Sequence, residues 1–275
     1  MAPIPALEHV SNALVTSSQL LKLKNVEDDE SLTVWFAHFQ LTSAAGILLR
    51  LMQEVTAHAI VLLQRFLVSS TPDNRRNFSP KNYSAAAIYL AAKLSATPVS
   101  PRSVINVYAY LTSEASPLRF INPAGAPTDV KPQSYFVSEG TYERERQRLF
   151  VCESMILVGL GFDTRVVLPY SLAFTYMQAL GVSATKLAQR VLEHLNAGLL
   201  SPQLLHLTHQ PNALAVGAIY LAARETGVKL VEQNWWEVFD VDREDLGFLV
   251  LSYGSMANFA QAAMDKWKDG PLPLD

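Results

Sequence analysis

The sequence has few of the residues on which several kinds of site depend. Its 275 residues include a single cysteine, Cys152, which excludes an internal disulfide and any metal site built on several thiolates. A net charge of −3 gives no overall attraction to nucleic-acid phosphates. The longest apolar run, Ala85–Ala92, is far below the roughly 20 residues that cross a bilayer, and residues 1–6 do not resemble a signal peptide. We therefore expect a soluble protein of a reducing compartment, without a membrane span or direct nucleic-acid binding.

Common catalytic motifs are also missing. The chain contains no GxxxxGK[ST] phosphate loop, no HExxH zinc motif and no GxSxG nucleophile elbow. His206 and His209 have the spacing of helical metal ligands, but no carboxylate lies near them in the sequence, so we interpret them as surface or capping residues. Cys152 has no histidine nearby and is interpreted as a small buried side chain. We expect no catalytic residue, no metal and no cofactor.

Prolines divide the chain into long segments that are rich in alanine and leucine. Apolar residues recur at steps of three and four between positions 55 and 67, and again between 187 and 199, the spacing of one helical face. We find no sustained alternation of apolar and polar residues, which is typical of half-buried strands. The sequence therefore predicts an all-α fold.

One segment of the chain occurs twice. The run Ala-Ile-Tyr-Leu-Ala-Ala-Lys at 87–93 recurs as Ala-Ile-Tyr-Leu-Ala-Ala-Arg at 218–224, an offset of 131 residues. The same offset aligns Pro80 with Pro211, Val104 with Trp235, Val107 with Val238 and Tyr108 with Phe239. Because prolines suit the first turn of a helix and small residues permit close packing, we predict central helices at Pro80–Leu94, capped by Ser79, and at Pro211–Glu225.

The repeat predicts two tandem bundles of about five helices each. We place an N-terminal extension at 1–33, the first repeat at 34–165, the second repeat at 166–265 and a C-terminal tail at 266–275. Ser113–Ser138, rich in proline and in small or polar residues, has no counterpart at the offset. We predict that it is an exposed loop inserted in the first repeat.

Several charged and aromatic residues allow two interpretations. Lys93 ends an apolar helix and Glu153 lies within an apolar stretch, so they either pair at the rim of adjacent helices or reach solvent separately. The mixed charges of 143–148 either contact an acidic partner or decorate a solvated helical face, which is the commoner use of this spacing. Trp235 and Trp236 either form a recognition surface or pack inside, and the offset favours the core for at least one of them.

The duplicated unit, the run at 87–93, and Glu153 followed by Gly161-Phe162-Asp163 resemble the cyclin box and its second repeat. This resemblance implies two five-helix cyclin-box repeats and a regulatory subunit without catalytic residues of its own. It also implies that the first repeat holds inward the kinase helix whose glutamate pairs with the ATP-contacting lysine. By position, Lys93 and Glu153 match the polar pair of the kinase interface, and Leu90, Leu94, Leu157 and Phe162 match its apolar contacts.

Four segments, 41–51, 64–66, 104–107 and 116–118, are similar to cyclin L in particular. The similarity implies a PITSLRE-type cyclin-dependent kinase as partner, further contacts with splicing or transcription factors, and a nuclear location. Two alternatives stay open. One is a K- or T-type cyclin of an RNA polymerase II tail kinase, and the other is a nucleic-acid-binding factor resembling transcription factor IIB, against which the acidic balance argues.

Two features depart from the family pattern. Residues 34–39 read Val-Trp-Phe-Ala-His-Phe, where cell-cycle cyclins carry a Met-Arg-Ala-Ile-Leu patch that docks substrates. Substrate docking of that kind is therefore not expected. L-type cyclins also carry an arginine- and serine-rich tail, whereas this sequence stops at Asp275. Either the tail is missing from this sequence or the protein has none.

Overall fold

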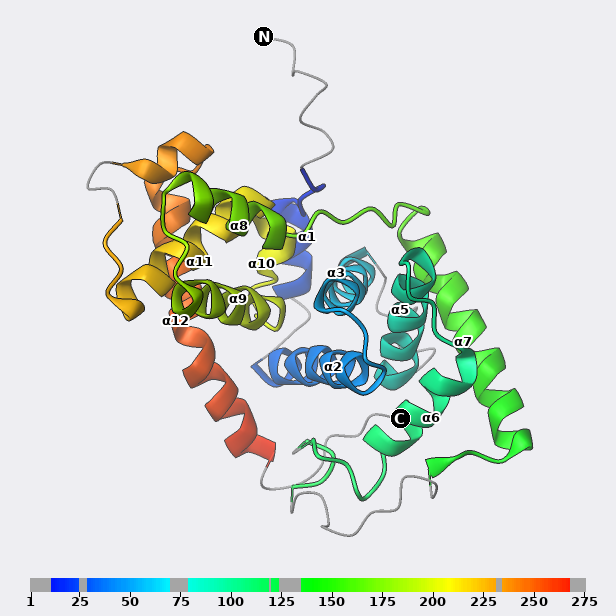
Figure 1. Ribbon diagram of the computed structural model, residues 1–275. Helices are drawn as coiled ribbons and strands as arrows, with labels where there is room; N and C mark the ends of the chain where they lie inside the picture. Colours follow the sequence, from blue (N-terminus) through cyan, green and yellow to red (C-terminus); the bar gives the residue numbers. More distant parts are fainter. Residues whose placement is uncertain are drawn as a thin grey trace. The chain divides into compact units, whose positions relative to one another are not determined.

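A computed structural model describes residues 11–24, 29–69, 79–118, 120–123, 135–230 and 234–267 (Figure 1). Every regular element within these ranges is a helix, which confirms the predicted all-α fold. None of the helices described is long and apolar enough to cross a membrane. The elements are α1 (Ser17–Lys24), α2 (Asp29–Leu48), α3 (Gln53–Ser69), α5 (Pro80–Leu94), α6 (Pro101–Leu111), α7 (Glu139–Gly159), α8 (Tyr170–Ala179), α9 (Thr185–Leu199), α10 (Leu205–Thr208), α11 (Pro211–Thr226), η3 (Trp235–Phe239) and α12 (Arg243–Lys266).

The helices are distributed between two compact units. The first unit comprises the described parts of Ser18–Thr164 and of Ala260–Asp275, and it contains α2, α3, α5, α6 and α7. The second unit comprises the described parts of Met1–Ser17 and of Arg165–Phe259, and it contains α8 to α11, η3 and most of α12. The architecture is therefore the predicted tandem arrangement of two helical bundles.

Helix α5 is the central element of the first unit and has the predicted bounds. It contacts α2, α3, α6 and α7, and it lies between α3 and α7 in Figure 1. Pro80 occupies its first turn, and Ser79 stands at the N-cap in an extended conformation, although the Ser79 hydroxyl makes no capping hydrogen bond. Ala87 and Ala91 are buried, so their small side chains let the neighbouring helices approach closely.

A chain of buried hydroxyl groups links α2, α5 and α6 inside the first unit. Thr42 Oγ1 donates to the His38 carbonyl at 2.8 Å, which uses its only proton. Ser84 Oγ, 2.7 Å from Thr42 Oγ1, must therefore donate to it. By the same reasoning, Tyr108 Oη, 2.5 Å from Ser84 Oγ, donates to Ser84. The chain runs in one direction, from Tyr108 to the His38 carbonyl.

Helix α11 occupies the central place in the second unit, where it contacts α8, α9, α10 and η3. It extends one residue beyond the predicted end and stops at Gly227, whose φ of +73° is the left-handed conformation that glycine adopts freely. Helix α12 packs against α11. The Tyr253 hydroxyl of α12 donates a hydrogen bond to the Leu214 carbonyl of α11 at 3.2 Å. An added Cβ at Gly217 would lie 2.9 Å from Leu249 Cβ, so this helix pair requires glycine for its close approach.

The two bundles differ at their fourth element. In the second unit the offset places the five-residue 3-10 helix η3 where the first unit has α6. Trp235 of η3 is 5% exposed, which confirms that at least one of the adjacent tryptophans is a core residue. Trp236 is half-buried.

The connection between α6 and α7 differs from the prediction. Its described residues form no α-helix, as expected, but Ala115, Ser116 and Phe120 are buried. The Phe120 ring packs edge to face against the Trp267 ring, with 5.1 Å between their centroids. The free energy gained by burying so large an apolar side chain holds this part of the segment against the unit, although its composition is typical of an exposed loop. The prediction of an exposed loop is therefore wrong for this part, while residues 119 and 124–134 lie outside the described ranges.

Candidate functional site

Lys93 and Glu153 form an ion pair between α5 and α7, which confirms their predicted pairing. Lys93 Nζ contacts Glu153 Oε1, with 43% of the lysine side chain exposed but only 9% of the glutamate side chain. The pair is thus not a surface salt bridge at a rim, because its carboxylate is inside the unit and its ammonium group is at the surface. The buried carboxylate depends on Lys93 for its counter-charge.

The sequence analysis missed two aromatic residues near this lysine, Tyr89, which contacts it, and Phe150, which packs on Tyr89. The Lys93 ammonium lies 4.8 Å from the centroid of the Tyr89 ring, a cation–π contact. The Tyr89 ring is in turn 6.0 Å from the Phe150 ring on α7. The available signal was helical spacing, since Tyr89 precedes Lys93 by four residues and Phe150 precedes Glu153 by three.

Exposed apolar side chains lie on the same two helices or directly after them. Leu94 is 52% exposed, Val158 68% and Phe162 70%, and Leu157 is half-buried. Leu90 is only 3% exposed, so it supports the surface from inside the unit, and its contact with a kinase stays a prediction. The α5–α7 surface is defined by Tyr89, Lys93, Leu94, Phe150, Glu153, Leu157, Val158 and Phe162.

The backbone after α7 turns sharply to present Phe162. Gly161 and Phe162 have φ values of +58° and +62°, the left-handed region that a phenylalanine rarely occupies. Two hydrogen bonds close the turn, from Phe162 N to the Leu157 carbonyl at 2.8 Å and from Gly161 N to the Val158 carbonyl at 3.0 Å. The strained residue is also one of the most exposed aromatic side chains among the described residues.

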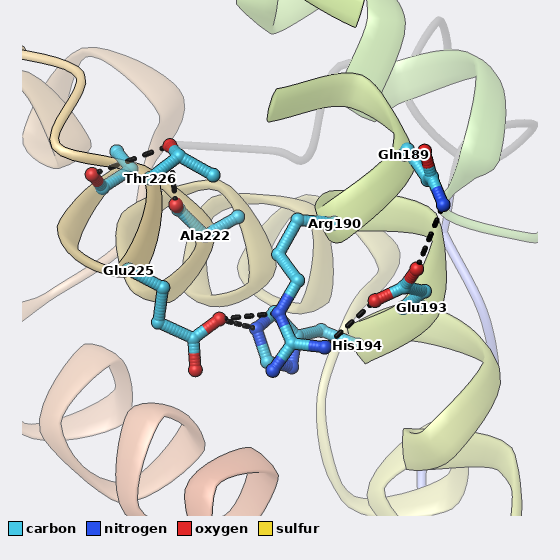
Figure 2. Close-up of polar contacts among 8 residues, drawn as sticks. Gln189, Arg190, Glu193, His194, Ala222, Glu225 and Thr226 are labelled. Carbon is cyan, nitrogen blue, oxygen red and sulfur yellow. Dashed lines mark hydrogen bonds and ion pairs between the residues drawn. The ribbon is translucent and has the colours of Figure 1, made fainter. Parts of the chain in front are cut away.

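The corresponding end of α11 is closed by polar contacts within the second unit. Figure 2 shows the Glu225 carboxylate, which the offset aligns with Leu94, accepting hydrogen bonds from Arg190 Nε at 2.5 Å and His194 Nε2 at 2.8 Å. Arg190 also donates to Glu193 at 2.7 Å. The hydrogen bond from Arg190 holds the pKa of Glu225 below its usual value. The two units therefore differ at equivalent positions, with an exposed leucine in one and an internally paired carboxylate in the other.

The remaining candidates of the sequence analysis have structural roles. Cys152 is buried, and burial raises its pKa to about 12, so the thiol stays protonated at neutral pH. His206 is buried rather than at the surface, which corrects the prediction, and burial lowers its pKa to about 4. The His209 ring stacks on Phe248 at 5.2 Å. Within the described ranges, no group of histidine, cysteine, aspartate and glutamate side chains could hold a metal ion.

Two further segments also have internal partners. On α7, Arg146 pairs with Glu143 at 2.8 Å and Arg148 pairs with Glu145 at 3.0 Å, which supports the interpretation of 143–148 as a solvated helical face. Residues 35–39 of α2 are buried. The region that departs from the substrate-docking patch of cell-cycle cyclins is thus part of the core.

Comparison with known proteins gives relatives over most of the chain, although no protein-family model matches it. The chain is 29% identical over 239 residues to an uncharacterized cyclin-L1-like protein of Schizosaccharomyces pombe, covering 86% of this chain and 87% of that protein. It is 30% identical over 206 residues to cyclin-T1-5 of Arabidopsis thaliana, covering 73% and 32%. It is 29% identical over 209 residues to cyclin-L2 of Mus musculus, covering 75% and 37%. The chain therefore spans about a third of the length of the plant and mouse proteins.

Two solved structures have a similar fold. One is a chain of the yeast RNA polymerase II CTD kinase CTDK-1 complex, with a TM-score of 0.67 and 15% sequence identity. The match covers 90% of the present chain and 73% of the yeast chain. The other is a chain of the CAK complex of Chaetomium thermophilum bound to ATP-gamma-S, with a TM-score of 0.50 and 14% sequence identity. The match covers 93% of the present chain and 65% of the Chaetomium chain. At these identities the likeness concerns the arrangement of helices alone.

Proposed function

Since the chain belongs to the cyclin family, we propose that it is a non-catalytic subunit that binds and activates a cyclin-dependent protein kinase. The observation that carries the proposal is the α5–α7 surface, where a surface ammonium group is fixed by a buried carboxylate. Leu94 and Val158 are exposed on the same two helices, and Phe162 is exposed in the turn directly after α7. A polar centre with apolar anchors beside it is the composition of a protein-binding hot spot.

The geometry suggests how such a surface would act on a kinase. Glu153 and the Tyr89 ring hold the Lys93 ammonium in place, and its other N–H groups remain able to donate to carbonyl oxygens of a docked helix. Val158 and Phe162 would bury apolar area on the same helix. Fixing the mobile kinase helix in its inward position brings its glutamate to the lysine that contacts the ATP phosphates. The chemistry would then belong entirely to the kinase.

We propose a PITSLRE-type kinase as the partner, with roles in transcription and pre-mRNA splicing and a location in the nucleus. This choice is supported by the resemblance of residues 41–51 and 104–107 to cyclin L and by the cyclin-L relatives. A kinase of the RNA polymerase II tail is the second candidate, because the chain is also similar to cyclin-T1-5 of Arabidopsis thaliana and a T-type cyclin is the alternative left open by the sequence. Phosphorylation assays with each purified kinase separate the two candidates.

The test of the surface uses variants that leave the fold intact. Val158→Glu and Phe162→Ser change exposed side chains, so they should leave the melting temperature nearly unchanged while weakening kinase binding at least about tenfold. Leu251→Glu, at a residue of α12 that is 75% exposed, is the matched control and should bind like the parent. If Val158→Glu and Phe162→Ser bind and activate both kinases normally, the assignment of this surface is wrong.

The ion pair needs a separate design because Glu153 is buried. Lys93→Ala would leave that carboxylate without its counter-charge and would destabilise the unit itself. The double variant Lys93→Met/Glu153→Gln removes both charges and keeps the approximate shape of both side chains. We expect it to fold, and to bind the kinase at least about tenfold more weakly, because the ammonium group that would donate to the partner is gone.

A further inference from the structure

The turn that carries Phe162 is attached to α3 as well as to α7. The ring of His58, on α3, lies beside the end of this turn, with 2.7 Å between His58 Nε2 and the Thr164 carbonyl oxygen. The end of α7 also approaches α3 closely, because a Cβ added at Gly159 would lie 2.9 Å from Phe66 Cδ2. Thr164 is two residues beyond Phe162, so this contact holds the backbone just after the exposed ring.

The direction of this hydrogen bond follows from the state of the His58 ring. Burial, as the largest effect, lowers the pKa of His58 below its usual 6.5, although the Thr164 hydrogen bond opposes the shift. The charge of Arg65 lowers the same pKa further. The ring is therefore neutral at pH 7 and carries one N–H. A carbonyl oxygen can only accept, so that proton is on Nε2 and His58 is the donor.

This anchor matters because the backbone of Phe162 is strained. Its φ of +62° is one that a phenylalanine rarely adopts, and such a conformation persists only where several neighbouring contacts enforce it. The N–H groups of residues 161–163 donate to carbonyls within 157–160, which constrains the turn from the α7 side. The hydrogen bond from His58 constrains it from α3, at the other end of the turn. Loss of that bond would leave the left-handed backbone less tightly held.

From this arrangement we infer that His58 is a positioning residue, whose hydrogen bond to the Thr164 carbonyl holds Phe162 in the orientation that the kinase meets. His58 is half-buried on α3 and need not touch the partner itself. The inference rests on the proposed kinase-binding function, and it adds to that function a residue of a helix outside the α5–α7 surface. A change at His58 should therefore alter kinase affinity through the Phe162 ring.

Hydrogen exchange tests the anchor without a kinase. His58→Leu removes the donor but keeps a bulky side chain, so the amide protons of residues 161–163 should exchange about three- to tenfold faster, the effect of losing one hydrogen bond. His58→Gln keeps an N–H near the position of the ring Nε2 and should restore most of the protection. Amide protons of α5 in the same proteins report the stability of the whole unit, so the local effect can be separated from a general loss of stability. Unchanged exchange at 161–163 in His58→Leu would overturn the inference.

Kinase binding tests how the anchor acts. The probe is the purified PITSLRE-type kinase or the RNA polymerase II tail kinase, whichever binds the parent chain. His58→Leu should weaken that binding about three- to tenfold, and His58→Gln should bind nearly like the parent. In a Phe162→Ser background His58→Leu should have almost no further effect, because the ring that it positions is gone. Equal losses in both backgrounds would refute the inference and leave the proposed surface standing, whereas normal binding by Phe162→Ser itself would overturn that surface and this inference with it.

Discussion

Replacing Ser84 with alanine should cost the first unit more than replacing Tyr108 with phenylalanine, although both changes remove a hydrogen bond. Ser84→Ala removes the middle hydroxyl of the buried chain and leaves the Tyr108 O–H without an acceptor, at about 1–3 kcal/mol for an orphaned buried donor. Tyr108→Phe removes the first donor and orphans nothing, because Ser84 still donates to Thr42. Its expected cost is about 1 kcal/mol.

The double variant provides the sharper test. Ser84→Ala/Tyr108→Phe contains no orphaned donor, since Thr42 still donates to the His38 carbonyl, so its cost should be less than the sum of the two single costs. Thermal melts measure the difference, because 1 kcal/mol shifts the melting temperature of a protein of this size by about 2–4 °C. Additive effects, or a Tyr108→Phe change as severe as Ser84→Ala, would refute the deduced direction of the hydroxyl chain.

Two further predictions concern acid stability and helix packing. The protein should lose stability as the pH falls from about 6.5 to 4. Burial lowers the pKa values of His38 and His206 to about 4, so both side chains stay neutral in the folded protein over this range. In the unfolded chain the same histidines take up protons, which favours unfolding. Each histidine contributes up to about 3 kcal/mol to this loss, and His38→Gln and His206→Gln should flatten the pH dependence in urea titrations. Gly198→Ala would place a Cβ 2.6 Å from a Tyr253 ring carbon and should destabilise the second unit by about 1–3 kcal/mol. Gly247→Ala, which meets no atom within 4 Å, is its control and should be neutral or stabilising in the same melts by about 0.5–1 kcal/mol.

The sequence predicted the features that depend on local pattern. Both central helices begin at prolines and carry the same alanine-rich run, so their bounds follow from helix-start chemistry and from the repeat. The apolar context of Lys93 and Glu153 left open whether they pair or reach solvent separately, and it was the resemblance to the cyclin box that favoured the pairing now observed.

Features that depend on which neighbour covers a helical face were not predictable from one sequence. Leu90 and Leu94 lie on the same helix, yet one is 3% and the other 52% exposed, because burial is decided by the packing of other elements. Phe120 stands in a loop-like stretch and is buried by Trp267, which is 147 residues away in the sequence. The 68% exposure of Val158 was not predictable for the same reason, since an exposed valine has no local signature in the sequence.

The left-handed backbone at Phe162 means that a substitution there that raises thermal stability would also remove a side chain of the proposed binding surface. Glycine would adopt a φ of +62° without the strain of roughly 1–2 kcal/mol that a larger side chain carries there. Phe162→Gly should therefore relax the turn after α7 and, in the same step, delete a ring that the proposed kinase surface exposes for its partner. Selection of substitutions by melting temperature alone would favour Phe162→Gly, and the resulting protein would be more stable but weakened in the proposed kinase binding.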